Sequence, residues 1–158
     1  MVLTDLEVAG VLIDAPLTLR FDLAVPDLIA AYGEREKHDA HELEKYEFTV
    51  IALDGEEVGQ VMSYLDQYRQ LTMHEAWALY LCASRGYGLL TRSPQLDKAA
   101  GEANIRTHTT LWLLDQMVVT GCVSPWEATT AVRRMQERGR DLDPARCDRF
   151  LTKWDRPK

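Results

Sequence analysis

Short apolar runs alternate with helix-like stretches up to residue 108, and this alternation is what most constrains the fold. The first run, Gly10 to Ile13, ends on Asp14 and reads as a central strand. Later runs cover residues 23–25, 48–53, 88–91 and 105–108. Such runs suit parallel strands that helices cover on both faces. We therefore expect an α/β fold, a three-layer α/β/α sandwich with a central parallel sheet of Rossmann-like topology.

Helix signals separate these runs and then continue alone to the C-terminus. Thr72 and Glu75 have the spacing of a capping box, and Ser124-Pro125-Trp126-Glu127 adds a proline at the first helical position. Asp143-Pro144 begins a last amphipathic helix. The two C-terminal helices must bury their apolar stripes, either on the same domain or on a partner, and we favour the first. The expected domains are 1–120 and a helical extension, 121–158.

Composition limits the class of protein. A chain of 158 residues, 46% hydrophobic and 27% charged, has the size and balance of one globular domain. Its three cysteines, Cys82, Cys122 and Cys147, are far apart, so neither a disulfide framework nor a zinc knuckle is indicated. A reducing cytoplasm fits best. No span of about 20 apolar residues occurs, so we expect neither export nor a membrane segment.

The formal net charge of −7 is unevenly distributed. Residues 1–120 carry 9 basic and 19 acidic side chains, whereas residues 121–158 carry 9 basic and 6 acidic ones. The acidic part could hold a cation. The basic part is explained either as a solvated helical tail or as a local rim for nucleic acid.

Four segments in a fixed order carry a family resemblance. They are Val11–Ala15, Val25–Ile29, the helix start at Glu75, and Leu89–Ser93. Together they resemble the PIN-domain family, which includes the VapC-type toxins of toxin-antitoxin pairs, over roughly residues 8–118. The tail from Gly121 is similar to that of small PIN-like proteins. The resemblance implies a metal-dependent endoribonuclease that acts on RNA with Mg²⁺ or Mn²⁺, a homodimer, and inhibition by a small antitoxin.

The family gathers three or four acids, because carboxylates hold the cation that neutralises a phosphodiester transition state. Asp14 matches the first position and Glu75 the third, and the resemblance implies that both hold the metal and support catalysis. Asp97, four residues after the fourth position, is a further candidate ligand. Each has a structural alternative: Asp14 as a strand-end cap, Glu75 as a capping-box residue, and Asp97 as a charge at a helix N-terminus.

Two positions depart from the family pattern. Tyr32 occupies the second acidic position, and Ser93 occupies the fourth, where the family has aspartate or asparagine. Tyrosine and serine can contact a phosphate but are poor Mg²⁺ ligands. Thr91 and Arg92, just before Ser93, would supply a hydroxyl and a phosphate contact. We therefore expect substrate-binding roles for Tyr32, Thr91, Arg92 and Ser93.

Three hypotheses remain open from the sequence. The first is an active ribonuclease with a reduced metal site. The second is a catalytically impaired PIN-like domain that binds nucleic acid or regulates a partner. The third is another doubly wound domain that shares only the pattern.

Overall fold

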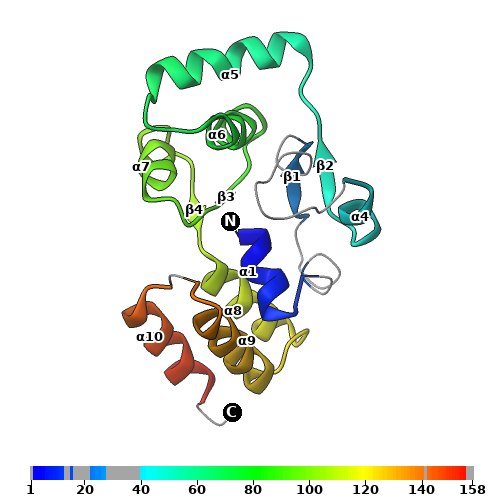
Figure 1. Cartoon of the computed structure of the whole chain (residues 1–158), viewed down its shortest axis with the longest axis vertical. Coiled ribbons are helices and arrows are strands. Elements are labelled where there is room, and N and C mark those ends of the chain that lie inside the picture. The colour runs from blue at the N-terminus through cyan, green and yellow to red at the C-terminus, as the bar shows by residue number, and fades with distance from the viewer. Residues whose placement is uncertain (1, 13–14, 16–21, 28–39, 141, 156–158) are drawn as a thin grey trace. The chain divides into compact units, whose positions relative to one another are not determined.

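The computed structural model describes residues 2–12, 15, 22–27, 40–140 and 142–155, with the backbone alone of residues 3 and 4 (Figure 1). The described helices are α1 (Val2–Ala9), α4 (Ala40–Lys45), α5 (Gly55–Gln67), α6 (Met73–Arg85), α7 (Pro94–Glu102), α8 (Thr110–Thr120), α9 (Pro125–Glu137) and α10 (Pro144–Trp154). The described strands are β1 (Ala24–Pro26), β2 (Thr49–Ile51), β3 (Leu89–Leu90) and β4 (Thr107–His108). None of these helices is long and apolar enough to cross a bilayer.

Internal contacts divide the chain into two compact units. Unit 1 combines Met1–Phe21 with Thr109–Lys158, and unit 2 is the continuous segment Asp22–His108. Unit 1 is therefore built from both ends of the chain. The expected division into 1–120 and 121–158 stays a prediction.

The strands of unit 2 form two parallel pairs. In the first, β1 pairs with β2 and Val25 lies opposite Val50. In the second, β3 pairs with β4 and Leu89 lies opposite Thr107. The mixed α/β class and the parallel pairing are thus confirmed. In the described part of the chain, however, the strands make two separate two-stranded sheets, so one central sheet between two helical layers is not seen.

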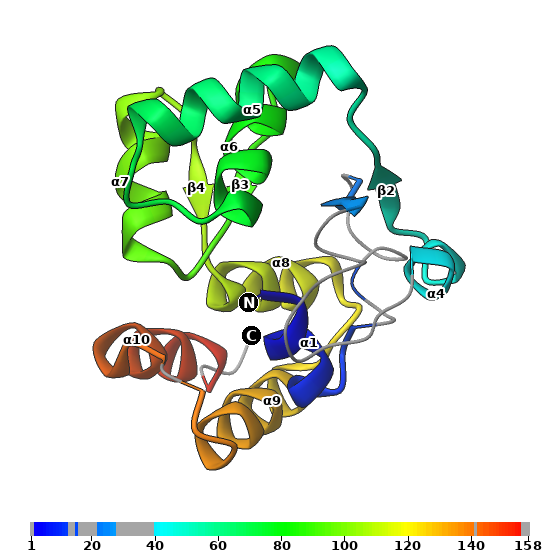
Figure 2. The same ribbon diagram turned by 45° about the horizontal axis from the view of Figure 1, so that its top comes forward.

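Helix α6 is the central helix of unit 2. Figure 1 looks nearly along α6, with α5 and α7 packed around it, and Figure 2 shows the same packing of α5 from another angle. Strands β1 and β3, one from each pair, also contact α6. A single helix thus contacts both strand pairs, so the packing of its side chains is important for the stability of unit 2.

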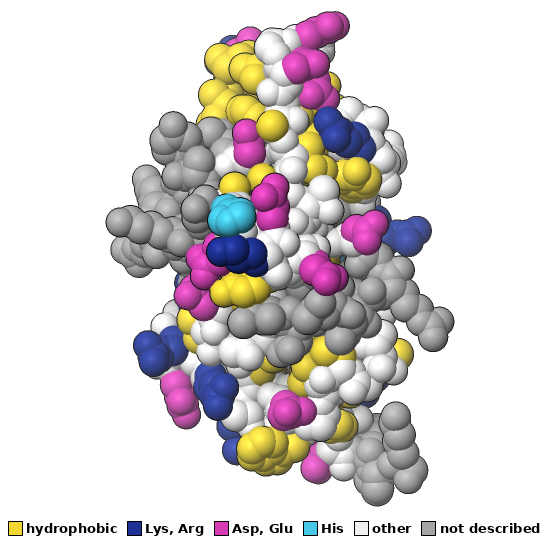
Figure 3. All heavy atoms as spheres, turned by 90° about the vertical axis from the view of Figure 1, so that its right-hand side faces the viewer, with side chains coloured by type: hydrophobic (Ala, Val, Ile, Leu, Met, Phe, Trp, Pro, Cys, Tyr) yellow, Lys and Arg dark blue, Asp and Glu magenta, His cyan; other side chains and the backbone are white. Residues whose placement is uncertain are grey.

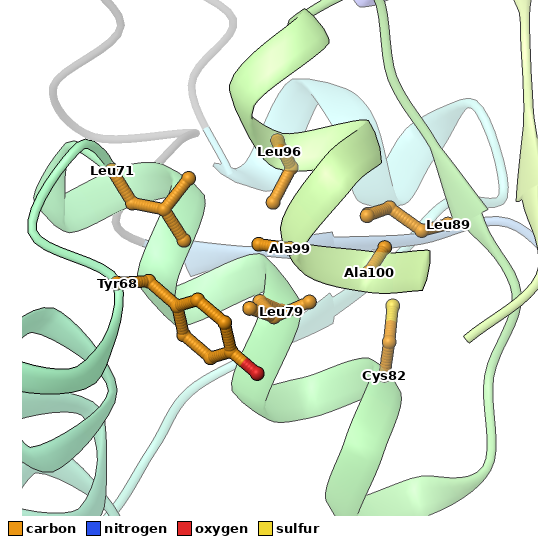
Figure 4. Close-up of a cluster of buried hydrophobic side chains, with 8 residues drawn as sticks. All are labelled: Tyr68, Leu71, Leu79, Cys82, Leu89, Leu96, Ala99 and Ala100. Atoms are coloured by element: carbon orange, nitrogen blue, oxygen red, sulfur yellow. The ribbon is translucent and has the colours of Figure 1, made fainter. Parts of the chain in front are cut away.

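Two clusters of buried side chains lie on different sides of α6. One contains Leu79 and Cys82 of α6 together with residues of α7, β3 and the turn before α6 (Figure 4). Its members are Tyr68, Leu71, Leu79, Cys82, Leu89, Leu96, Ala99 and Ala100. The other contains Ala76, Trp77 and Leu81 of α6 with Ile51 of β2 and Val61 of α5. The i, i+3, i+4 spacing along α6 divides its apolar residues between these two clusters.

Local capping signals set where several helices begin. Thr72 and Glu75 form the capping box at α6, and Ser124 and Glu127 form the one at α9, as predicted. Asp143 caps α10, which starts with Pro144 as predicted. These motifs work because side-chain oxygens accept hydrogen bonds from backbone N–H groups that the first helical turn leaves unpaired.

The C-terminal helices pack within unit 1. Helix α9 contacts α1, α8 and α10. Its predicted buried stripe is confirmed, since its four residues are at most 1% exposed: Ala128, Ala131, Val132 and Met135. In α10, Cys147 and Trp154 are buried. Packing on the chain itself, the favoured expectation, therefore accounts for the α9 stripe and for Cys147 and Trp154 of the α10 stripe, whose other two members, Phe150 and Leu151, are half-buried.

The strand expected at residues 10–14 is wrong for its described residues, Gly10 to Leu12. Helix α1 ends here: Gly10 has φ +77°. The N–H of Val11 donates to the carbonyl of Leu6 at 3.0 Å, and the N–H of Gly10 donates to that of Glu7 at 2.9 Å. These two bonds are a Schellman motif, which needs a left-handed residue after the helix. The apolar residues after Gly10 therefore belong to the turn that ends α1 and not to a strand.

The charge-rich segment 40–47 is partly buried. Residues Ala40–Lys45 form α4, and Leu43 of α4 is completely buried. The Tyr46 hydroxyl donates to the Glu42 carboxylate at 3.0 Å. That hydrogen bond, with the negative charge of Glu42, raises the pKa of Tyr46.

Unit 1 buries two aspartates that the sequence did not single out. Asp5 of α1 is 0% exposed. It accepts hydrogen bonds from the Thr110 hydroxyl at 2.7 Å and from Arg140 Nε at 2.7 Å. Asp115 of α8 accepts from Lys153 Nζ at 2.6 Å and from the Trp154 indole at 3.0 Å. Asp5 thus links α1 to α8 and to the loop after α9, and Asp115 links α8 to α10. Such partners are needed because they offset the hydration that a buried carboxylate loses.

Candidate functional site

Two of the predicted site residues, Asp14 and Tyr32, lie outside the described residues. The structure therefore does not test the first and second positions of the expected acidic site. The other candidates, Glu75, Thr91, Arg92, Ser93 and Asp97, all lie in unit 2.

Glu75 is the third residue of α6, where it closes the capping box. Its Oε2 accepts hydrogen bonds from the Thr72 backbone N–H at 2.8 Å and from the Thr72 hydroxyl at 3.0 Å. In return, the Glu75 N–H donates to Thr72 Oγ1 at 3.3 Å. Both carboxylate bonds use one oxygen, and within the described part of the chain no hydrogen bond reaches Oε1. The capping role thus leaves one oxygen of Glu75 for another ligand.

Thr91 and Ser93 form a compact turn between β3 and α7. The Ser93 N–H donates to Thr91 Oγ1 at 3.0 Å, and Thr91 is 8% exposed. Ser93 is the N-cap of α7, because its hydroxyl accepts the Leu96 N–H at 3.2 Å and donates to Gln95 Oε1 at 3.2 Å. Both hydroxyls are committed to shaping the turn. Arg92, between them, is half-buried.

Asp97 lies on the exposed side of α7, one turn after Ser93. Its Oδ1 accepts a hydrogen bond from the Thr107 hydroxyl of β4 at 2.6 Å. The carboxylate therefore links α7 to the strand beside it. Thr107 was not predicted to take part. The only sequence signal for it is its place in the last short strand, whose end was expected near the site.

The predicted ligands come together only in part. The structure joins Thr91 to Ser93, and Asp97 to Thr107, but it shows no hydrogen bond between Glu75 and either pair among the described residues. That part of the chain also contains no group of three or more His, Cys, Asp or Glu side chains that could hold a metal ion. On the face drawn in Figure 3, acidic side chains are spread among basic and hydrophobic ones.

The donor set limits the cation that would fit. Mg²⁺ commonly binds through one or two carboxylates, keeps several waters, and takes further oxygens from substrate phosphates. Glu75 Oε1 fits such a loosely held ion. The Asp97 carboxylate is available in the same way, because Thr107 donates to its Oδ1 and no hydrogen bond from a described residue reaches its Oδ2. A closed, all-protein metal cage does not fit the described residues.

His108, at the end of β4, is held in its neutral form. Burial lowers its pKa, and the positive charge of Arg106 lowers it further. A neutral imidazole can accept a proton, and one at a strand end lies where ligands of parallel sheets usually bind.

The same shift predicts a pH dependence of stability. Because folding lowers the pKa of His108, the contribution of this residue to stability is fully present above its unfolded pKa of about 6.5 and is lost as the pH falls through the folded pKa. We expect His108→Gln to flatten the decline in the urea midpoint between about pH 7 and pH 5. An NMR titration of His108 with an ordinary pKa, or equal declines in both proteins, would contradict this.

Cys82 is not a nucleophile at neutral pH. Burial raises the pKa of its thiol to about 11. Its Sγ donates to the carbonyl oxygen of Gly88 at 3.7 Å, toward the start of β3. Because the thiolate is the reactive form, this cysteine acts as a core residue.

Two buried nitrogens of α6, Nε2 of His74 and Nε1 of Trp77, have no hydrogen-bond partner among the residues that the structure describes. The residues are three apart, so they lie on one side of the helix. Trp77 belongs to the cluster with Ile51 and Val61. The two nitrogens flank Glu75 in sequence but share no hydrogen bond with it.

Comparisons with models of protein families, with curated proteins and with solved structures found no match.

Proposed function

We propose that this chain is a PIN-like domain that hydrolyses RNA with one loosely held Mg²⁺ or Mn²⁺ ion. The observation that carries the proposal is Glu75. It keeps its helix cap with Oε2 alone, so that Oε1 can hold a cation at the start of the central helix. The ordered resemblance of the surrounding segments to PIN domains supports the same function.

The resemblance implies that Asp14 and Glu75 would hold the ion, which would neutralise phosphate charge and activate water. Asp97, which belongs to the same unit as Glu75, is a further candidate ligand. With two carboxylates in place of the family's three or four, metal affinity should be reduced. Tyr32 and Arg92 would contact phosphates of the bound RNA, whereas Thr91 and Ser93 would hold the shape of the turn before α7.

The three-layer PIN-like arrangement belongs to this proposal as well. Two parallel strand pairs on one central helix support it, whereas the turn at Gly10–Leu12 counts against its first strand. The resemblance further implies a small antitoxin as inhibitor. The dispersed cysteines favour a location in the cytoplasm.

Glu75→Gln separates the catalytic role from the capping role. Glutamine also closes a capping box, so the free energy of unfolding of the variant should lie within about 0.5 kcal/mol of that of the wild type. It lacks the negative charge that a cation needs. We expect Mn²⁺-dependent cleavage of single-stranded RNA to fall at least about 100-fold, since even residues that only orient a metal ligand are worth about 10–100-fold.

Glu127→Gln is the matched control, because Glu127 closes the same kind of box at α9. There Ser124 N–H donates to Glu127 Oε2 at 2.8 Å, and these Ser124 hydrogen bonds lower the pKa of Glu127. Cleavage should be unchanged in this variant. Equal loss in both variants would assign the effect to helix capping. A wild-type protein with no cation-dependent cleavage of any RNA would end the nuclease proposal.

A second candidate function, a PIN-like domain that binds without catalysis, is favoured by the turn after β3. Ser93 stands where the family places an acid, and its hydroxyl is used by Leu96 and Gln95. Calorimetric titration of the wild type with Mn²⁺ separates the candidates. Heat of binding that disappears in Glu75→Gln favours the nuclease, and no binding at millimolar Mn²⁺ favours the noncatalytic domain.

A further inference from the structure

Two carboxylates of unit 2 are held by threonine hydroxyls. The Thr107 hydroxyl of β4 donates to Asp97 Oδ1 at 2.6 Å, and the Thr72 hydroxyl, at the start of α6, donates to Glu75 Oε2 at 3.0 Å. No hydrogen bond from a described residue reaches the other oxygen of either carboxylate, Asp97 Oδ2 or Glu75 Oε1. Each carboxylate is therefore fixed at one oxygen and open at the other.

These hydroxyl donors are neutral, so they leave the charge of both carboxylates uncompensated. Glu57 of α5 shows the alternative, because Asp54 N–H donates to its Oε2 at 3.1 Å and Arg85 Nη2 donates to its Oε1 at 3.3 Å. The guanidinium neutralises Glu57 and occupies its second oxygen. Neither Asp97 nor Glu75 forms an ion pair with a described residue. Both thus keep the negative charge that attracts a cation.

The backbone of Thr107 is fixed by the strand pair. Leu89 lies opposite Thr107, and its N–H donates to the Arg106 carbonyl at 2.9 Å. On the other side of Thr107, the N–H of Thr91 donates to the His108 carbonyl at 3.0 Å. The hydroxyl of Thr107 therefore starts from a fixed position, and its 2.6 Å bond has the length expected for a hydroxyl that donates to an ionised carboxylate.

A hydroxyl that fixes a carboxylate lowers the cost of binding an ion there. A free carboxylate loses conformational entropy when it coordinates a cation, whereas a side chain that is already held has lost that entropy during folding. Partners that bond to a metal ligand, and not to the metal, are worth about 10–100-fold in metal affinity or activity. The effect is largest where only one or two carboxylates hold the ion, because each then supplies a larger share of the affinity.

We propose that Thr107 and Thr72 are positioning residues, which hold Asp97 and Glu75 so that the open oxygen of each can bind Mg²⁺ or Mn²⁺. The inference rests on the proposed function, because it takes both carboxylates as ligands of that ion. It adds that two residues that do not bind the ion themselves set the affinity of the site through their hydroxyl groups.

Thr107→Val tests the first threonine, because valine lacks the hydroxyl and keeps the β-branched shape that suits a strand. In calorimetric titration of the full chain with Mn²⁺ and no RNA, we expect the affinity to fall about 10–100-fold. Thr107→Ser, which restores a hydroxyl, should recover most of the loss. Thr49→Val is the matched control and should bind as the wild type does. Thr49 is an exposed strand residue of the same unit, and its hydroxyl has no hydrogen bond with a described residue.

Thr72→Gly tests the second threonine, because glycine caps a helix about as well as threonine but has no hydroxyl. The affinity for Mn²⁺ should again fall about 10–100-fold, and Thr72→Ser should restore it. Ser124→Gly, which makes the same kind of change at the start of α9, is the control and should leave the affinity unchanged. Circular dichroism should show the same folded state in all these variants.

The order of the Asp97 side chain in the metal-free protein gives a readout that needs neither ion nor RNA. Carbon-13 relaxation of its methylene group should show a rigid side chain in the wild type and in Thr107→Ser, and a mobile one in Thr107→Val. A mobile Asp97 in the wild type overturns the positioning role of Thr107.

The titrations separate this inference from the function on which it rests. If the wild type binds Mn²⁺ and Thr107→Val or Thr72→Gly binds it equally well, the positioning role of that threonine is wrong and the proposed function stands. If the wild type binds no Mn²⁺ at millimolar concentrations, the proposed function fails and the inference fails with it.

Discussion

Asp5→Ala is expected to lower the free energy of unfolding by about 3–5 kcal/mol, the usual cost of removing one partner of a buried ion pair. The Asp5 side chain is 0% exposed, and its two oxygens are shared between Arg140 and Thr110. Truncation removes the carboxylate that offsets the partly buried guanidinium. It also leaves the buried Thr110 hydroxyl without its acceptor.

Urea unfolding followed by circular dichroism measures this effect. Asp148→Ala, which removes an exposed aspartate of α10 in the same unit, is the matched control and should change stability by no more than about 0.5 kcal/mol. Asp5→Asn keeps acceptor capacity and should lie between the two. A loss below about 1 kcal/mol in Asp5→Ala would show that the contacts with Thr110 and Arg140 do not stabilise unit 1.

Leu79→Ala is expected to destabilise unit 2 by about 2–5 kcal/mol. Leu79 is completely buried in the cluster of Figure 4, which also contains Leu89 of β3 and the small residues Ala99 and Ala100 of α7. Those neighbours belong to different elements that are held by their own hydrogen bonds. They cannot collapse fully into the space, so a cavity term adds to the lost transfer free energy.

Met62→Ala is the control for that prediction. Met62 lies on α5 and is 49% exposed, so its truncation should cost little. Both variants are compared by thermal and urea unfolding, with the fluorescence of buried Trp77 as a probe within unit 2. Equal stability of Leu79→Ala and wild type would mean that this cluster contributes little to the unit.

The sequence predicted best those features that local contacts determine. The starts of α6, α9 and α10 follow from capping residues within three positions of each helix, and the structure shows those hydrogen bonds. The short strands at Leu89–Leu90 and Thr107–His108 follow from apolar runs bounded by turn residues. In each case the physical cause lies in neighbouring residues, so a single sequence reveals it.

The errors arose where the cause lies elsewhere in the chain. An apolar run such as Gly10 to Leu12 suits either a buried strand or the turn that ends a buried helix, and only the fold around it decides. No residue near Asp5 in the sequence marks it as buried. Its partners Thr110 and Arg140 lie 105 and 135 positions away, a pairing that no local pattern encodes.

The sequence predicted the local roles of the candidate site residues better than the contacts that these residues make. The spacing of Thr72 and Glu75 revealed the cap, but it did not reveal that one carboxylate oxygen makes both bonds. The helix-start role of Asp97 was foreseen, whereas its bond to Thr107 depends on how β4 lies beside α7. Side-chain partners across two elements need the tertiary structure.

The composition of unit 1 from both chain ends has a consequence for synthesis on the ribosome. Residues 22–108 form a continuous unit whose contacts are complete once that segment has emerged. Helix α1 is made before unit 2, whereas Thr110, Arg140 and α9 are made after it. While unit 2 is being made, α1 therefore has its apolar side and Asp5 uncovered. Emergence of residues 109–158, rather than of α1 itself, is what allows unit 1 to fold.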